Sequence, residues 1–177
     1  MNKRSAGILL YRLNNNSLEV LLVHPGGPFW AKKDLGAWSI PKGEFSEEEN
    51  PLDAAKREFQ EEIGIEAFGE FIELTPITQK SGKIIYAWVS QGNIDPKGIK
   101  SNTFEIEWPP RSGKKQKFPE IDRGEWFNVQ EAKEKINPSQ SALIDELVNR
   151  LNLTEEQHKK RSTSAKKRDK TSQFDLF

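Results

Sequence analysis

Two apolar runs near the start of the chain predict neighbouring β-strands. Residues 6–11 read Ala-Gly-Ile-Leu-Leu-Tyr and residues 18–23 read Leu-Glu-Val-Leu-Leu-Val, with three asparagines at positions 14–16 between them. A short Asn-rich link between two apolar runs favours a hairpin turn. Strands that are apolar at nearly every position are typical of a sheet covered on both faces. Further strands are expected over residues 68–75 and 84–89, and a hairpin over residues 104–118.

A helix is predicted between two residues that favour helix ends. Asn50 is a favourable N-cap, Pro51 suits the first helical position because its missing N–H would have no partner there, and Gly64 ends the helix. The apolar residues between these ends recur at steps of three and four, which predicts a buried stripe. The stripe consists of Leu52, Ala55, Phe59 and Ile63.

Three carboxylates share another face of this helix. Glu58, Glu61 and Glu62 stand at positions i, i+3 and i+4. Carboxylates this close repel one another and raise each other's pKa unless a cation lies among them, and the helix dipole disfavours anions in the C-terminal half. A hard divalent ion would reverse this energetic balance, and ligands that are all oxygen indicate Mg²⁺ or Mn²⁺. From the charge pattern alone, a solvated acidic face is the alternative.

The sequence around this helix resembles a known motif, the Nudix box. All nine defined positions of the box are present over residues 43–65, and residues 38–44 resemble the family's entry to the box. Resemblance to the Nudix hydrolases implies an α/β/α sandwich with a mixed central sheet and a catalytic loop–helix–loop. It also implies a divalent-metal requirement and cleavage of a nucleoside diphosphate linked to another moiety. The matching positions are Gly43, Glu49, Arg57, Glu58, Phe59, Glu61, Glu62, Gly64 and Ile65.

The resemblance also assigns roles to residues of the motif. Arg57 and Glu49 are expected to pair and to orient the helix rather than to do chemistry. Lys42, directly before Gly43, is expected to place its ammonium beside the phosphates. The metal ligands expected from this stretch are Glu58, Glu61, Glu62 and the carbonyl of Lys42.

A further carboxylate is expected from outside the box. In this family a glutamate a few residues ahead of an aromatic strand often reaches the metal site. Glu120, six residues before Trp126, is the candidate here, and Asp122 is the second choice. Glu120 or Glu61 is then the expected general base, which would take a proton from the attacking water.

Several aromatic and cationic residues are candidates for binding a nucleotide. Trp30 lies in a polar, Gly/Pro-rich loop, where it either covers the sheet edge or stacks on a nucleobase, an interaction worth about 1–3 kcal/mol. The hairpin over residues 104–118 offers a tryptophan and several cations, although an exposed hairpin with a Lys-guarded edge is the alternative. The candidate substrate-binding residues are Trp30, Trp38, Lys42, Trp108 and Arg111.

These features together predict metal-dependent hydrolysis of a phosphoanhydride bond in a nucleoside diphosphate-linked substrate. The entry to the box and the position of Glu120 resemble the dinucleoside-polyphosphate branch more than the oxidised-nucleotide branch. Nucleoside triphosphates, capped RNA 5′ ends and ADP-ribose stay open as substrates. The alternative is a non-catalytic Nudix-fold module that binds a nucleotide, although a module of that kind need not keep all the carboxylates.

Composition limits the remaining possibilities. The 177 residues suit one domain, and the absence of cysteine excludes disulfides, thiolate zinc sites and a cysteine nucleophile. No signal peptide or membrane-spanning stretch is recognisable, so the cytoplasm is the expected compartment and no membrane partner is expected. Residues 1–153 are predicted to form the Nudix domain.

The last segment, residues 154–177, has a different composition. It is polar and Lys-rich without apolar periodicity, which predicts a flexible tail. Its basic stretch is suited to contact DNA or RNA without sequence preference, but flexibility alone would account for it too. The final residues Gln173–Phe177 resemble the motif by which bacterial proteins bind the replication sliding clamp, with Phe174 where leucine is usual. The alternative is a terminus that docks on its own domain.

Overall fold

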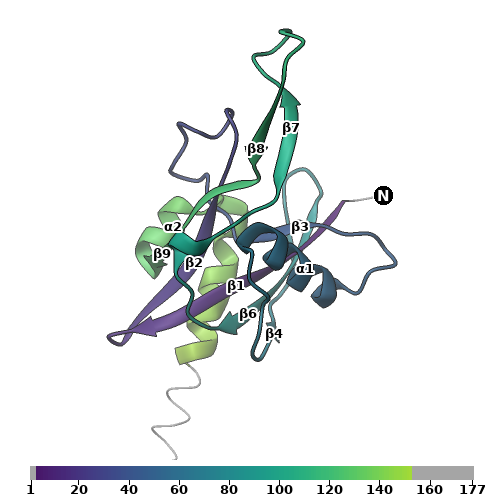
Figure 1. Ribbon diagram of the computed structural model, residues 1–177. Coiled ribbons are helices and arrows are strands. Elements are labelled where there is room, and N and C mark those ends of the chain that lie inside the picture. Colours follow the sequence, from purple (N-terminus) through teal and green to yellow (C-terminus); the bar gives the residue numbers. More distant parts are fainter. Residues whose placement is uncertain (1–2, 153–177) are drawn as a thin grey trace, which may run out of the picture. The chain divides into compact units, whose positions relative to one another are not determined.

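A computed structural model describes residues 3–152 of the chain (Figure 1). The chain divides into two compact units, Met1–Ile144 and Asp145–Phe177. The tail expected from residue 154, its basic stretch and the clamp-like residues Gln173–Phe177 lie outside the described residues. Within residues 3–152, no helix combines the length and apolar character needed to cross a membrane.

The first unit consists of groups of strands separated by single helices. Residues 141–152 are helical as well. In chain order the elements are β1 (Arg4–Asn14), β2 (Ser17–Pro25), β3 (Lys42–Glu44), α1 (Pro51–Ile63), β4 (Ile72–Glu73), β5 (Ile77–Thr78), β6 (Ile84–Gln91), the 3₁₀-helix η1 (Pro96–Gly98), β7 (Thr103–Glu107), β8 (Lys115–Pro119), β9 (Ile121–Asn128), α2 (Val129–Lys135) and the 3₁₀-helix η2 (Pro138–Gln140).

The central sheet is mixed, as the resemblance implied. Seven strands form it in the order β4-β6-β1-β2-β9, with β3 paired to β1 and β5 paired to β6. β1 runs antiparallel to β2 but parallel to β6. The expected turn between β1 and β2 contains Asn15 and Asn16 at φ 48° and 62°. These left-handed values suit asparagine, and they match the twist of the two strands.

The segment over residues 68–75 forms less strand than its sequence predicts. Only Ile72 and Glu73 pair with β6, at the edge of the sheet. Gly69, at φ 96°, and Pro76 flank this short strand. Both residue types interrupt regular pairing, which keeps the edge strand short.

Helix α1 begins and ends as its sequence predicts. The Asn50 side-chain oxygen accepts hydrogen bonds from the backbone N–H groups of Leu52 (3.0 Å) and Asp53 (3.2 Å). Gly64 closes the helix at φ 83°, and its N–H donates to the Gln60 carbonyl. The buried stripe is wider than expected, since Ala54 is also fully buried.

Helices cover both faces of the sheet. On one face, Phe59 and Ile63 of α1 pack in a core that includes Ile8 of β1. Phe127 of β9 belongs to the other face, because side chains alternate along a strand. There it packs edge-on against Trp38, whose backbone N–H donates to the carbonyl of Lys135 at the end of α2. The fold is therefore the expected α/β/α arrangement (Figure 1).

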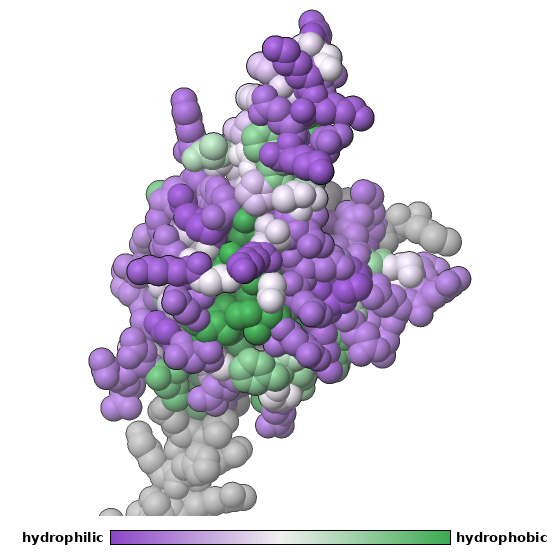
Figure 2. Space-filling view, viewed as in Figure 1, coloured by the Kyte–Doolittle hydropathy of each residue, from purple (hydrophilic) through white to green (hydrophobic). Residues whose placement is uncertain are grey.

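The strands β7 and β8 form a second sheet of their own. They pair antiparallel, with Phe104 opposite Phe118, which confirms the hairpin predicted over residues 104–118. The hairpin stands apart from the seven-stranded sheet in Figure 1, and Figure 2 shows that its outer end is hydrophilic.

The N-cap of α1 allows a direct test of local stability. We expect Asn50→Ala to lower the free energy of unfolding by about 1 kcal/mol, because two helical N–H groups lose their acceptor. Urea unfolding at constant m-value measures this change. Asn50→Asp, which keeps the acceptor oxygen, is the control. Equal losses in both variants would show that the cap contributes nothing.

Candidate active site

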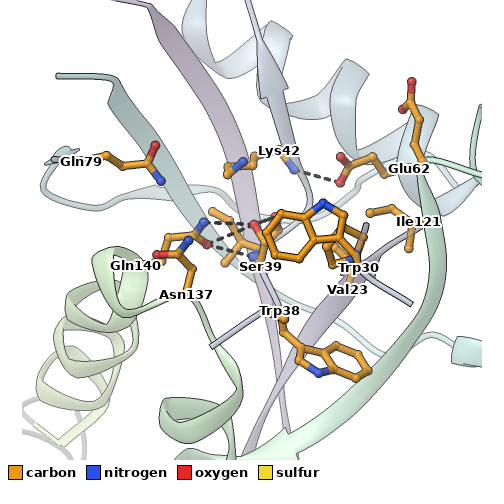
Figure 3. Close-up of a pocket in the computed structure, with 14 residues that line it drawn as sticks. Val23, Trp30, Trp38, Ser39, Lys42, Glu62, Gln79, Ile121, Asn137 and Gln140 are labelled. Atoms are coloured by element: carbon orange, nitrogen blue, oxygen red, sulfur yellow. Dashed lines mark hydrogen bonds between the residues drawn. The ribbon is translucent and has the colours of Figure 1, made fainter. Parts of the chain in front are cut away.

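A pocket lies beside α1, at the start of β9 and next to the segment 137–140 (Figure 3). Lys42, Glu62 and Glu120 provide its charged side, and Trp30 provides an aromatic wall. The cavity holds about 210 Å³. Pockets that enclose a whole drug-sized ligand hold roughly 300–1,000 Å³. The cavity therefore suits one end of a nucleotide substrate, with the rest outside it.

Arg57 organises the carboxylates at the edge of this site. Its Nε and Nη2 donate to the two carboxylate oxygens of Glu49 at 2.8 and 3.0 Å. Its Nη1 donates to Glu58 (2.6 Å) and to Glu61 (3.2 Å). The hydrogen bond with Glu49 raises the pKa of Arg57 and lowers that of Glu49. The expected pairing of Arg57 with Glu49 is confirmed, and the same guanidinium also offsets repulsion between Glu58 and Glu61.

The Glu58 carboxylate lies directly against Gly43 of β3. Glu58 is 8% exposed, and burial raises the pKa of its carboxyl group. A Cβ at position 43 would overlap the Glu58 carboxylate. Gly43 therefore lets the β3 backbone lie directly against this acid, as the absence of a side chain permits.

Glu62 and Lys42 meet at the side of the pocket. The backbone N–H of Lys42 donates to Glu62 Oε2 at 3.0 Å, as Figure 3 shows. Burial raises the pKa of Glu62 and lowers that of Lys42, and the opposite charge of each partner counters this effect. The structure thus brings together Glu62, predicted as a metal ligand, and Lys42, predicted to lie beside the metal-bound phosphates.

The two acids proposed from outside the box have different surroundings. Glu120 precedes β9 and lines the pocket together with Glu62. Burial raises the pKa of Glu120, and the negative charge of Glu61 raises it further. Asp122 instead lies 2.9 Å from the Nδ1 atom of His24. Of the two candidates, Glu120 is the one that lines the pocket with Glu62.

The carboxylates have the right chemistry for a hard cation but are not gathered around one point. Within residues 3–152, no group of three or more acidic or histidine side chains has the spacing of a metal site. Glu58 and Glu61 face Arg57, whereas Glu62 faces the Lys42 backbone. All candidate ligands are oxygens, and burial raises the pKa of three of the acids, Glu58, Glu62 and Glu120. The donor set fits Mg²⁺ or Mn²⁺, and binding requires the side chains to converge.

The two tryptophans near the pocket differ in exposure. Trp30 is 38% exposed and lines the pocket, and Lys33 Nζ lies 4.8 Å from the centre of its ring. Trp38 is 1% exposed, and its indole N–H donates to Asp34 at 2.8 Å. In Figure 3 the Trp30 ring lies across the pocket and the Trp38 ring points away from it. Of these two pocket-lining tryptophans, Trp30 is the one whose ring is exposed.

The hairpin candidates lie elsewhere. The Trp108 ring packs edge-on against Phe29, with ring centres 5.5 Å apart. Arg111 lies in the connecting turn at φ 61°. Neither residue is among the described residues that line the pocket. The structure therefore does not bring Trp108 or Arg111 to the carboxylates.

The sequence gives no signal for the side-chain amides that line the pocket. Gln140 is 1% exposed, its Oε1 accepts from the Ile40 N–H at 3.1 Å, and its Nε2 donates to Ser39 Oγ at 3.1 Å. Gln79 and Asn137 line the same pocket. The Gln140 and Ser39 partners are 101 positions apart in the chain. No local pattern marks such residues, because only tertiary contacts give them a role.

Known proteins share this architecture. The NUDIX domain model matches residues 1–147. The bis(5'-nucleosyl)-tetraphosphatase [asymmetrical] of Rattus norvegicus is 30% identical over 103 residues, which cover 51% of this chain and 66% of the rat protein. The chain thus spans slightly less than two thirds of the length of this relative.

Two solved structures have the same fold. A Caenorhabditis elegans Ap4A hydrolase in a binary complex superposes with a TM-score of 0.61 at 19% identity, covering 84% of this chain and 98% of that one. The NUDIX domain of Shewanella oneidensis NrtR complexed with ADP ribose superposes with a TM-score of 0.57 at 15% identity, covering 85% and 89%. The likeness in sequence to the tetraphosphatase supports the expected resemblance to the dinucleoside-polyphosphate branch, and the two solved structures show the shared fold. Because the family model spans most of the sequence, the chain belongs to the NUDIX domain family.

Proposed function

We propose that this chain is a divalent-metal-dependent hydrolase that cleaves a phosphoanhydride bond in a nucleoside diphosphate-linked substrate. Dinucleoside polyphosphates and nucleoside triphosphates are the favoured substrates. One observation carries the proposal: the same pocket has Lys42, Glu62 and Glu120 at one side and the exposed ring of Trp30 at another. Such a pocket offers charged groups to phosphates and a flat apolar face to a nucleobase.

The charged side supports the hydrolytic part of the proposal. Glu58, Glu61 and Glu62 would hold Mg²⁺ together with the Lys42 carbonyl and Glu120. The bound ion supplies positive charge against the phosphate oxygens and Lewis acidity. The ammonium of Lys42, which lies in buried surroundings, offsets the charge of the leaving phosphate.

Glu120 or Glu61 is the general base in this proposal. A general base works best when its pKa lies near the working pH. Burial and the charge of Glu61 move the pKa of Glu120 in that direction. Glu120 also lines the pocket directly, which favours it over Glu61.

The amide groups support the nucleobase part. The Asn137 side-chain oxygen accepts from the N–H and the Oγ of Ser139 at 3.0 and 2.8 Å. Because a backbone N–H can only donate, this contact fixes the orientation of the Asn137 amide and turns its nitrogen to the other side. Gln79 Nε2 donates to the same Ser139 hydroxyl at 3.1 Å. A base that stacks on Trp30 would therefore meet amides whose orientation is already set.

A non-catalytic nucleotide-binding module is the second candidate function. The NrtR domain, which has the same fold, was solved with ADP ribose. The names of the rat tetraphosphatase and the nematode Ap4A hydrolase favour the enzyme instead. Retention of every carboxylate of the Nudix box also favours the enzyme.

A substrate panel tests the proposed activity. The panel contains diadenosine tetraphosphate, common and oxidised nucleoside triphosphates, ADP-ribose, NADH and 5′-triphosphorylated RNA, each with Mg²⁺ and with Mn²⁺. We expect one strongly preferred substrate, whose products locate the bond that is cleaved. Without metal the turnover should disappear. Binding of a nucleotide without turnover of any panel member would establish the binding module instead.

Replacement of Glu62 tests the site. We expect Glu62→Gln to lower turnover by about 100-fold or more, because it removes one charged oxygen ligand from the phosphate side of the pocket. Folding should be retained, since the pocket side chain keeps its size and its ability to accept from the Lys42 N–H. Steady-state kinetics and urea unfolding measure the two effects.

Glu66→Gln makes the same chemical change at an exposed position and is the control. It should leave turnover unaltered. An active, metal-dependent Glu62→Gln variant would contradict the assignment of Glu62.

The contact between Gly43 and Glu58 gives an independent test. We expect Gly43→Ala to reduce turnover by at least about tenfold, because the new Cβ displaces the Glu58 carboxylate from its place beside β3. Gly98→Ala is the matched control, because a Cβ at that position meets no atom within 4 Å. Wild-type turnover in Gly43→Ala would show that the position of Glu58 is unimportant.

A further inference from the structure

His24 is a fully buried residue with two hydrogen-bonding partners. It lies near the end of β2 and is 0% exposed. Its Nδ1 lies 2.9 Å from Asp122 Oδ1, and its Nε2 lies 2.6 Å from the carbonyl oxygen of Lys33. The Lys33 carbonyl can only accept a hydrogen bond, so Nε2 is the donor of this contact. The ring therefore links strand β9 to the loop that follows β2.

The loop contact leads directly to Trp30. The backbone N–H of Lys33 donates to the Trp30 carbonyl at 2.9 Å, and Lys33 Nζ lies over the Trp30 ring at 4.8 Å. The hydrogen bond from His24 thus holds Lys33. The backbone of Lys33 bonds to the Trp30 carbonyl, and its ammonium lies over the Trp30 ring. Trp30 is 38% exposed, and its own N–H donates to the Gly27 carbonyl at 3.4 Å, so its place in the pocket wall depends on the backbone of this loop.

The contact between His24 and Asp122 connects the ring to the acidic side of the pocket. Asp122 is two residues beyond Glu120, and the Glu120 carbonyl accepts from the Gly26 N–H at 2.8 Å. The loop is also tied down beyond Lys33, where the Gly36 N–H donates to the Glu134 carbonyl at 3.0 Å. Between these two points the loop is held at Lys33 by His24 and at Asp34, whose carboxylate accepts from the Trp38 indole N–H at 2.8 Å and pairs with Lys135. Of these contacts, the one from His24 holds the residue whose N–H donates to the Trp30 carbonyl.

We propose that His24 is a positioning residue that holds Trp30 in the wall of the pocket through the Lys33 carbonyl. It sets the affinity for the nucleoside part of the substrate without contacting the substrate. The inference rests on the proposed function, in which Trp30 stacks on a nucleobase. It predicts that loss of the bond to Lys33 acts on KM and spares kcat.

Two amide substitutions separate the contacts of the ring. In His24→Gln the side-chain nitrogen is as many bonds from Cα as Nε2 is in histidine. This variant therefore keeps a donor for the Lys33 carbonyl. In His24→Asn the shorter side chain reaches only as far as Nδ1, so it keeps a donor for Asp122 and loses Lys33. The proposal requires that Gln behaves like the wild type and that Asn does not.

The kinetic test compares these variants with Trp30→Ala on the preferred substrate. We expect Trp30→Ala to raise KM by roughly 5- to 100-fold. His24→Asn should raise KM within that range with kcat changed less than about threefold, and His24→Gln should restore KM. The double variant His24→Asn/Trp30→Ala should have the KM of Trp30→Ala alone, because both changes remove one interaction. Additive effects, or a loss confined to kcat, would overturn the proposal.

A second readout is independent of catalysis. The Lys33 carbonyl belongs to the peptide bond that endoproteinase Lys-C cleaves. Native His24→Asn should be cut after Lys32 or Lys33 at least about fivefold faster than the wild type and His24→Gln, while urea unfolding reports global stability separately. Equal cleavage rates in all three proteins would overturn the proposal even if the enzyme is active. Faster cleavage in a protein that turns over nothing would leave the anchor correct and the proposed function wrong.

His24→Leu serves if His24→Asn does not fold. Leucine fills the ring's place and leaves no buried donor without a partner, while Asp122 and Lys33 can turn to solvent. This variant should show the same faster cleavage after Lys33 and the same rise in KM. Wild-type behaviour of His24→Leu would overturn the proposal.

Discussion

The site depends on one guanidinium that separates negative charges on a single helix. Arg57 donates to Glu49 with two nitrogens and to Glu58 and Glu61 with the third. Without this group, acids at spacings of three and four residues would repel one another in partly buried surroundings. The same guanidinium ties the loop before α1 to the helix, so the electrostatics of the site and the geometry of its entry loop have a common origin.

Strand β3 brings the backbone to this charged helix. β3 pairs with β1 in a register that places Lys42 opposite Gly7 and Gly43 opposite Ala6. The strand can pass beside the Glu58 carboxylate because residue 43 has no side chain. The residue before this glycine, Lys42, donates its backbone N–H to Glu62 at 3.0 Å. The register of a three-residue strand thus sets the distance between the groups that would face phosphates.

The opposite side of the pocket is built by hydrogen bonds rather than by charge. Gln140 is held by the Ile40 N–H, and the loop that carries Trp30 is held by His24. These contacts orient the side of the pocket that would bind a nucleobase, whereas the carboxylates would bind the metal beside the phosphates. Under the proposed function, binding of the nucleoside and chemistry at the phosphate are therefore controlled by different residues on different elements.

The sequence by itself determined the features that depend on local chemistry. Asn50 and Gly64 bound α1 because capping acts over a few neighbouring residues, and the spacing of Arg57 and the glutamates places them along one helix. The apolar runs of β1 and β2 likewise determined a covered sheet. Only the tertiary structure decided which tryptophan is open to a ligand, since Trp30 and Trp38 look alike in the sequence and differ in burial. It also decided the contacts of Gln140 with Ile40 and of His24 with Asp122, because hydrogen bonds between residues about 100 positions apart leave no pattern in the chain.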